Sequence, residues 1–175
     1  VKSIDINWFG NYLRTNSKLE VINKDIRDIN DSDLQDVESI IHLANIANDP
    51  AVELEPKLSW DINVLASQQL ASKAIKSGVK NFIFASSGSV YGVSDKEKVD
   101  EETELLPISE YNKTKMVAER VFLSYQDKMK IFCIRPATVC GVSPRMRLDV
   151  SVNVLTYSAL KDGLIKVFGG NQIRP

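Results

Sequence analysis

The chain has 175 residues, of which 43% are hydrophobic and 26% charged, and its formal net charge is −1. This composition is ordinary for a globular domain, and the near-neutral charge argues against nucleic acid or a membrane surface as the main partner. No apolar run reaches the roughly 20 residues that span a bilayer, and a single histidine with two cysteines argues against a zinc site.

The start of the chain, Val1–Asp5, has the pattern of neither a signal peptide nor a transit peptide. It lacks an initiator methionine, so we expect the chain to begin inside a longer protein. Cys133 and Cys140 make no disulfide framework, and they are expected to be buried thiols in or after an apolar segment. These features together predict a cytoplasmic protein.

Short apolar segments predict β-strands. They are Lys2–Asp5, Leu19–Asn23, Ser39–Leu43, Asn81–Ala85 and Ile131–Arg135, with a further strand-like segment at Ile165–Phe168. The runs Ile40–Leu43 and Phe82–Ala85 are apolar without alternation, which suits strands of a parallel sheet that are covered on both faces.

Longer segments with helical periodicity lie between the strands. The first helix is predicted over Lys57–Ser77 and ends at Gly78. Its expected apolar stripe comprises Leu58, Ile62, Leu65, Leu70, Ala74 and Ile75. Two more helices are predicted over Ser109–Gln126 and Val150–Lys161. This order predicts an α/β fold with a doubly wound, Rossmann-like parallel sheet, in which ligands bind beyond the carboxyl ends of the strands.

A Tyr-x-x-x-Lys pattern, Tyr111 to Lys115, falls on one of the predicted helices. The i, i+4 spacing places both side chains on one helix face. A nearby ammonium would favour the phenolate and lower the tyrosine pKa, so that Tyr111 could exchange a proton with a substrate hydroxyl. The alternative is a solvated helix face, on which this spacing is common.

Polar residues also follow the predicted strands. The hydroxyls of Ser86–Ser89, after the strand Asn81–Ala85, could bind a polar ligand or merely satisfy their own backbone. Asp5 ends the first strand, where a carboxylate could accept both hydroxyls of an adenosine ribose and repel a 2′-phosphate. A solvated loop aspartate is the alternative.

The segments Ala85–Gly92 and Tyr111–Lys115 together resemble the serine and Tyr-x-x-x-Lys motifs of the extended short-chain dehydrogenase/reductase family, the group of NAD-dependent nucleotide-sugar epimerases and dehydratases. Further segments resemble that family in the same order, namely Lys24–Asp28, Ile41–Ala44, Asp61–Val64 and Arg135–Gly141. Each motif alone is unspecific, but the ordered set covers nearly the whole chain.

The resemblance implies NAD as the cofactor and assigns a role to each residue of the site. Tyr111 is then the catalytic acid/base, Lys115 tunes it and holds the nicotinamide ribose, and Ser87 hydrogen-bonds the reacting hydroxyl. The other residues expected to bind the cofactor are Asp5, Asp25, Ile26, Leu43, Ala44, Asn45, Asn63, Ala85, Ser86, Pro136 and Thr138. His42 has no catalytic role in this scheme and is expected to be a packed structural group.

The implied substrate is a nucleotide-diphosphate sugar. Its expected binding residues are Ser87, Gly88, Ser89, Asn153, Phe168 and Arg174, although the last three also fit ordinary structural roles. Residues 1–145 are expected to form the NAD-binding domain, and residues 146–175 to begin a small substrate-binding region. Similar enzymes dimerise through two helices, which predicts a homodimer through residues 57–77 and 109–126.

The chain departs from the family pattern at two places. No Gly-x-x-Gly-x-x-Gly turn is present, so we expect the sheet to be incomplete at the N-terminus, without its first strand and pyrophosphate loop, and the chain alone to bind NAD poorly and to be inactive. Gly88 and Ser89 stand where the 4,6-dehydratases of the family carry an Asp-Glu pair, which argues against dehydration.

The expected activity is therefore NAD-dependent epimerisation of a nucleotide-linked sugar, at C4, through a transient 4-keto intermediate. The alternatives are a nucleotide-sugar reductase or dehydrogenase with net hydride transfer, and a non-catalytic NAD-binding scaffold.

Overall fold

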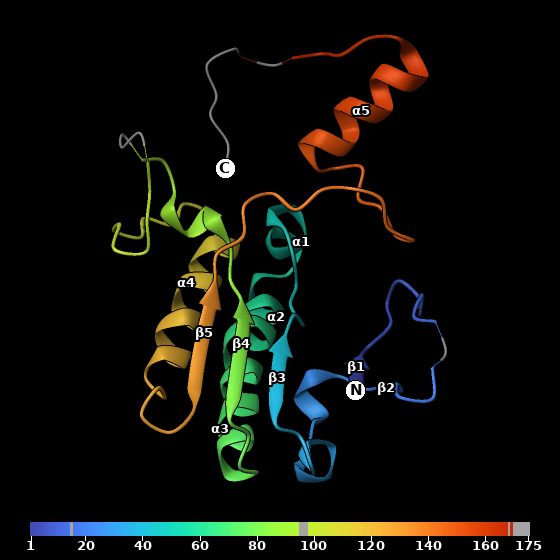
Figure 1. Cartoon of the computed structure of the whole chain (residues 1–175). Helices are drawn as coiled ribbons and strands as arrows, with labels where there is room; N and C mark the ends of the chain where they lie inside the picture. Colours follow the sequence, from blue (N-terminus) through green and yellow to red (C-terminus); the bar gives the residue numbers. More distant parts are fainter. Residues whose placement is uncertain (15, 95–97, 168, 170–175) are drawn as a thin grey trace.

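The computed structural model describes residues 1–14, 16–94, 98–167 and 169 of the chain. Its strands form two separate parallel sheets. In the first sheet, β1 (Lys2–Asp5) pairs with β2 (Glu20–Asn23). In the second, β4 (Asn81–Ala85) lies between β3 (Ser39–His42) and β5 (Lys130–Ile134). The parallel strands and intervening helices confirm the predicted Rossmann-like α/β class (Figure 1).

The three predicted helices are present. α2 (Pro56–Trp60), the π-helical segment η3 (Asp61–Ala66) and α3 (Ser67–Lys76) together form the first. α4 (Glu110–Leu123) is the second, and α5 (Ser151–Asp162) is the third. The sequence did not predict the short elements α1 (Asp49–Leu54), η1 (Ile26–Asp28), η2 (Asp31–Leu34) and η4 (Gly88–Tyr91).

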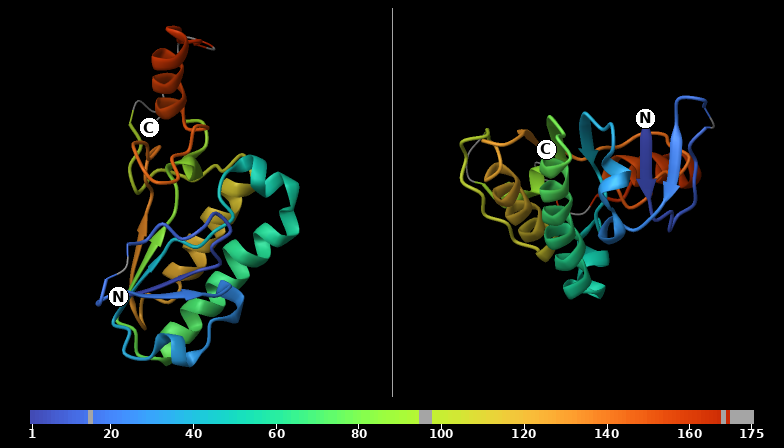
Figure 2. Two further views of the ribbon diagram at one scale, coloured as in Figure 1. Left: turned by 90° about the vertical axis from the view of Figure 1, so that its right-hand side faces the viewer. Right: turned by 90° about the horizontal axis from the view of Figure 1, so that it is seen from below.

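Helices α2, α3 and α4 cover one face of the β3–β4–β5 sheet, and α5 stands beyond the carboxyl ends of its strands (Figures 1 and 2). The opposite face is open, with Ile41 69%, Phe132 51% and Ile134 53% exposed. The expectation that both faces of these strands are covered is therefore wrong for the described residues. The cause is the helix arrangement, because both crossovers of this sheet pass over the same face.

The main core lies between the sheet and the helices. Phe82, Phe84 and Phe122 are fully buried, and the Phe122 ring centroid lies 4.9 Å from that of Phe82 and 4.6 Å from that of Phe84. His42 packs against all three rings, and its Nε2 lies 2.8 Å from the hydroxyl of Ser67. That hydroxyl donates to a backbone carbonyl, so Nε2–H of His42 is the donor to it. The geometry agrees with a structural histidine.

We expect His42 to make folding sensitive to acid. Burial first, and the charge of Lys115 second, lower the pKa of His42 to about 3. The unfolded chain takes up this proton near its ordinary pKa of about 6.5, so the contribution to stability is complete above that pH and is lost as the pH falls toward 3. At pH 5 the loss amounts to about 2 kcal/mol.

Urea denaturation at about pH 7.5 and pH 5 checks this. The wild-type protein should lose more stability between the two values than a His42→Gln variant, which keeps a hydrogen-bond donor but does not titrate. An equal loss in both proteins contradicts the assignment.

Three smaller expectations are corrected. Leu65 was placed in the apolar stripe of the first helix but is 51% exposed, because the π-helical turn changes the rotation of the residues around it. Ile165–Val167 form no strand, and Phe168 lies outside the described residues. Cys140 is exposed rather than buried, whereas Cys133 is half-buried.

Within the described residues, no helix is both long and apolar enough to cross a membrane.

Candidate active site

The segments that follow β4 and β5 are joined at the carboxyl end of the sheet. The backbone N–H of Ser86 donates to the carbonyl of Ile134, and that of Gly88 donates to the carbonyl of Pro136, both at 2.8 Å. A Cβ at Gly88 would lie 3.2 Å from the Pro136 carbonyl oxygen, so the absence of a side chain permits this approach. The predicted residues Ser86–Ser89 and Pro136 are thus brought together.

Three polar side chains converge beside η4. The hydroxyls of Ser87 and Ser89 lie 2.7 Å apart, and the Ser87 oxygen also accepts a hydrogen bond from the Ser89 backbone N–H at 3.2 Å. Ser89 donates to Oδ1 of Asn112 on α4 at 2.6 Å. Ser87 is consequently held at the N-terminus of η4 and faces the helix that carries Tyr111.

Lys115 is buried behind this group. Its Nζ donates to the carbonyl of Ala85 at 2.7 Å, and lies 4.7 Å from the ring centroid of Phe84 and 5.8 Å from that of Tyr111. Only 3% of Lys115 is exposed. Burial lowers the pKa of Lys115 to about 8, whereas the charge of Glu119 opposes this shift. The ammonium is therefore positioned within the site by the end of β4.

Burial raises the pKa of Tyr111. The charge of Arg147 lowers it, that of Asp49 raises it, and the hydroxyl of Ser87 lowers it by hydrogen bonding to the phenol oxygen. The lowered pKa predicted from the Lys115 spacing is therefore wrong for this state of the protein, because burial outweighs the favourable charges. The cation whose charge acts on the phenol is Arg147, which the sequence did not single out.

Arg147 is held by the loop between β5 and α5. Its guanidinium pairs with Asp149 through two hydrogen bonds of 3.0 and 2.6 Å. The side chain of Asn153 accepts from the N–H of Gly141 at 3.0 Å and donates to the carbonyl of Arg147 at 2.8 Å. Asn153, predicted to bind substrate, thus fixes the loop that carries Arg147. The sequence offered only the Arg-x-Arg pattern of Arg145 and Arg147, more than ten residues after the end of β5, as a signal for this residue.

The segment after β3 is held by Asn63 on the π-helical turn. Asn63 is 1% exposed, and its amide accepts from the N–H of Ile46 at 2.8 Å and donates to the Ile46 carbonyl at 3.1 Å. It also donates to the hydroxyl of Thr114 on α4 at 3.2 Å. The amide therefore shapes the segment Leu43–Asn45, where Leu43 is exposed and Ala44 and Asn45 are half-buried.

The acidic residues predicted for the adenosine half of the cofactor lie on the other sheet. Asp5 ends β1, and its carboxylate accepts from the N–H of Asn7 at 2.6 Å. Asp25 follows β2 and pairs with Arg27 through side-chain hydrogen bonds of 3.0 and 2.8 Å, which lower the pKa of its carboxyl. Ile26 packs against the small apolar cluster that includes the Tyr111 ring.

Two hydroxyls that the sequence predicts to bind the cofactor lie at the ends of β4 and β5. Ser86 is 4% exposed, and its hydroxyl is the buried side-chain group that lacks a hydrogen-bond partner among the described residues. Thr138 is exposed at the same end of the sheet. An unpartnered buried hydroxyl next to Lys115 is suited to a polar ligand. Arg174, like Phe168, lies outside the described residues.

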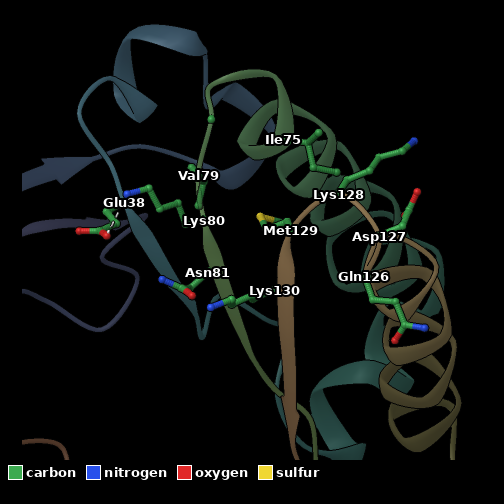
Figure 3. Close-up of a pocket in the computed structure, with 11 residues that line it drawn as sticks. Glu38, Ile75, Val79, Lys80, Asn81, Gln126, Asp127, Lys128, Met129 and Lys130 are labelled. Carbon is green, nitrogen blue, oxygen red and sulfur yellow. Dashed lines mark hydrogen bonds and ion pairs between the residues drawn. The ribbon is translucent and has the colours of Figure 1, made fainter.

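A hollow of about 570 Å³ lies at the opposite end of the sheet (Figure 3). Lys80, Asn81 and Lys130 line it at the amino ends of β4 and β5. Lys80 pairs with Glu38 at 3.4 Å, and both side chains are largely exposed. Because this hollow lies at the amino ends of the strands, it forms no part of the candidate site. In the described part of the chain, no three His, Cys, Asp or Glu side chains gather as a metal ion would require.

Comparison with known proteins places this geometry in context. Residues 9–175 match the NAD dependent epimerase/dehydratase family. A putative UDP-glucose 4-epimerase of Methanocaldococcus jannaschii is 34% identical over 177 residues, covering 94% of this chain and 57% of the relative. The solved structure of MoeE5 in complex with UDP-glucuronic acid and NAD is similar with a TM-score of 0.81 at 26% identity, covering 97% of this chain and 56% of that one.

A second solved structure, the UDP-glucuronic acid 4-epimerase of Bacillus cereus in complex with UDP-glucuronic acid and NAD, has a TM-score of 0.75 at 29% identity. The match covers 88% of this chain and 49% of the chain in that structure. The chain thus spans about half the length of the proteins it matches. The resemblance inferred from the motifs is confirmed, and NAD is the cofactor of this group. The chain therefore belongs to the NAD-dependent epimerase/dehydratase family, within the extended short-chain dehydrogenases/reductases.

Proposed function

We propose that the protein epimerises a nucleotide-linked sugar at C4 through a transient 4-keto intermediate. The observation that carries the proposal is the grouping of Ser87, Tyr111 and Lys115 at the carboxyl end of β4. The Ser87 hydroxyl acts on the phenol of Tyr111 and lowers its pKa, and the Lys115 ammonium lies 5.8 Å from the centroid of the Tyr111 ring on the same helix. A base, a hydroxyl donor and a cation in one place are what the protein must provide for a nicotinamide cofactor to oxidise a secondary alcohol.

In this proposal Tyr111, as phenolate, takes the proton of the C4 hydroxyl while Ser87 hydrogen-bonds the same oxygen. NAD held in this site would supply the acceptor and donor of the hydride that C4 loses and regains. Tyr111 then gives the proton back to the C4 oxygen, so no cofactor is consumed. Lys115 holds the nicotinamide ribose and contributes positive charge near the phenolate.

The cofactor is proposed to extend from this group toward the first sheet. Ala85, Ser86, Pro136 and Thr138 would lie along the nicotinamide, and Leu43, Ala44, Asn45 and Asn63 beside the middle of the cofactor. Asp25 and Ile26 would face the adenine. Asp5 would accept the hydroxyls of the adenosine ribose, which favours NAD over NADP.

Dehydration is disfavoured by the residues next to Ser87. Gly88 has no side chain, and an acidic side chain there would press against the Pro136 carbonyl oxygen, 3.2 Å from a Cβ. The Ser89 hydroxyl is hydrogen-bonded to Ser87 and Asn112. Elimination of water needs an acid and a base near C5 and C6, and neither position provides one.

The substrate is proposed to be a nucleotide-diphosphate sugar that enters between the end of β4 and the loop before α5. Ser87, Gly88 and Ser89 would face the sugar. Asn153 would act through the loop that it holds. Phe168 and Arg174 would bind the nucleotide. For Arg174 the reason is that a guanidinium binds phosphate through paired hydrogen bonds.

We propose further that residues 1–145 form the NAD-binding domain, and that the 175-residue chain by itself binds NAD weakly and turns over no sugar. The activity measurements proposed here therefore use a longer protein in which a first strand and a pyrophosphate loop complete the sheet. The supporting observation is the separation of the two sheets, because the described residues form no strand pairing between β1 and β3. Isothermal titration of the chain with NAD would test this, and micromolar binding would count against it.

Assembly and location are also proposed. A homodimer through the helices at residues 57–77 and 109–126 is supported by exposed apolar side chains such as Leu65 on that helical layer. Sedimentation of a Leu65→Glu variant as a monomer, beside a dimeric wild type, would support this dimer.

A cytoplasmic location is proposed as well, and two free cysteines agree with it.

Removing the charge of Arg147 should make Tyr111 a poorer acid. Because this charge lowers the Tyr111 pKa, an Arg147→Gln variant should have a higher one. We expect the limb of the kcat profile that reports ionisation of Tyr111 to move up by about 0.5 to 1 pH unit. An unchanged limb would show that Arg147 does not act on the phenol.

The proposal is tested by incubating the protein with UDP-, dTDP-, GDP- and CDP-sugars and identifying products by proton NMR. A sugar inverted at C4 without net NADH supports epimerisation. Net NADH formation would favour a reductase or dehydrogenase, and a 4-keto-6-deoxy product would mean dehydration. If no sugar turns over and Tyr111→Phe leaves the biological function intact, the protein is a scaffold.

A further inference from the structure

A buried ion pair joins three of the segments that build the candidate site. Glu119 on α4 is 1% exposed and accepts hydrogen bonds from Arg135, with Nε at 3.1 and 3.2 Å and Nη2 at 2.8 Å. Arg135 follows β5 directly, and its Nη1 donates to the hydroxyl of Tyr91 in η4 at 2.9 Å and to the carbonyl of Glu101 at 3.5 Å. The pair thus links α4, the end of β5 and η4.

Each of these segments carries residues of the site. α4 carries Tyr111 and Lys115, spaced so that Glu119 continues the same helix face four residues further on. Arg135 immediately precedes Pro136, whose carbonyl accepts from Gly88 at the start of η4. A bidentate contact between the buried Glu119 carboxylate and the half-buried Arg135 guanidinium fixes distance and direction more firmly than a single hydrogen bond.

Glu119 also supplies the negative charge that acts on Lys115. The Lys115 ammonium contacts Tyr111 on α4 and Phe84 and the Ala85 carbonyl on β4, and its charge interacts with those of Glu119 and His42. Cys133 on β5 and Arg135 just after it interact with Glu119 in turn. The ring of His42 is neutral, because its pKa is lowered to about 3, and the thiol of Cys133 is neutral, because its pKa is raised to about 12. Glu119 is thus the group that favours the charged form of Lys115 against burial.

We propose that Glu119 is a positioning residue of the candidate site: paired with Arg135, it fixes α4 against the ends of β4 and β5 and keeps the buried Lys115 ammonium protonated. The inference rests on the proposed function in one respect, that Lys115 assists Tyr111. The link between Glu119 and Lys115 itself is a property of the fold.

The first test measures this link without turnover. The protein is labelled with ¹³C-lysine, the Lys115 signal is identified by its absence from a Lys115→Arg variant, and its titration is followed by NMR. In Glu119→Gln we expect Lys115 to titrate about one pH unit lower. The matched control is Glu110→Gln, which removes an exposed carboxylate from the same helix and should leave the Lys115 titration unchanged. No shift in Glu119→Gln overturns the inference.

Should Glu119→Gln not fold, Arg135→Gln tests the same link from the other side. It leaves the Glu119 carboxylate without its cation, so Lys115 should titrate at higher pH than in the wild type. A shift to lower pH, or none, contradicts the proposal.

The second test uses activity. Because the rate depends on the proton of Lys115, the limb of the kcat profile that reports Lys115 should move about one unit lower in Glu119→Gln, with KM changed less than twofold. Glu119→Asp, which keeps the charge, should restore the limb. An NMR shift without any turnover in the wild type would sink the proposed function and leave the positioning role standing.

Discussion

Replacing Tyr111 with phenylalanine is expected to lower kcat by about 10²- to 10⁴-fold, the contribution of one positioned acid/base group. The ring of Tyr111 packs in the apolar cluster with Ile46, Val52 and Ile62, and phenylalanine retains those contacts. The loss should therefore appear in kcat with little change in KM or in thermal stability. Turnover of the nucleotide sugar in the presence of NAD, measured across a range of pH, provides the test.

Tyr125→Phe is the matched control. Tyr125 lies just after the end of the same helix, away from the serines of η4. Its hydroxyl accepts a hydrogen bond from the side-chain amide of Gln68 at 2.8 Å. This variant should keep wild-type turnover. If Tyr111→Phe also kept it, Tyr111 would not be the acid/base, and the mechanism proposed above would be wrong.

The largest effect on stability is expected from Gly92→Ala, which should cost about 3 kcal/mol or more in the free energy of unfolding. Gly92 ends η4 with φ 66° and ψ −139°, a region that essentially only glycine occupies. A Cβ at this position would also overlap the carbonyl oxygen of Leu106. Backbone strain and steric overlap therefore act together.

Gly163→Ala is the comparison in which both of these causes are absent. Gly163 ends α5 with a similar φ of 65° but with ψ 13°, in the ordinary left-handed region, and no atom lies within 4 Å of an added Cβ. Its replacement should cost about 1 kcal/mol. Urea denaturation of the two variants measures the difference, and equal midpoints would show that the contact with Leu106 does not constrain the fold.

The local residue pattern predicted the elements that position the site. β4 was predicted with its observed bounds, and the predicted start of the second helix at Ser109 is the residue whose hydroxyl accepts from the N–H of Asn112 and caps α4. Such features depend on neighbouring residues, which the sequence displays directly. The serines after β4 and Tyr111 were recognised by the same local signals.

Features that depend on packing between distant segments were missed. Ile41 and Phe132 alternate with buried or half-buried residues, but whether their own face of the sheet is covered depends on where the helices cross. Arg147 acts on Tyr111 through a loop 36 residues further along the chain, and no periodicity predicts that approach. Glu119 could have been noticed as a charged residue four positions after Lys115 on the buried helix face, although its partner Arg135 becomes apparent only in the fold.

The central claim, oxidation and reduction at C4 of the sugar, is tested most directly with a nucleotide sugar that carries deuterium at C4. The protein is incubated with it in ordinary water and the product is examined by NMR. Our account predicts a product inverted at C4 that retains its deuterium there, because the hydride leaves and returns without exchange with solvent. Loss of deuterium from C4, or a product deoxygenated at C6, would contradict the account.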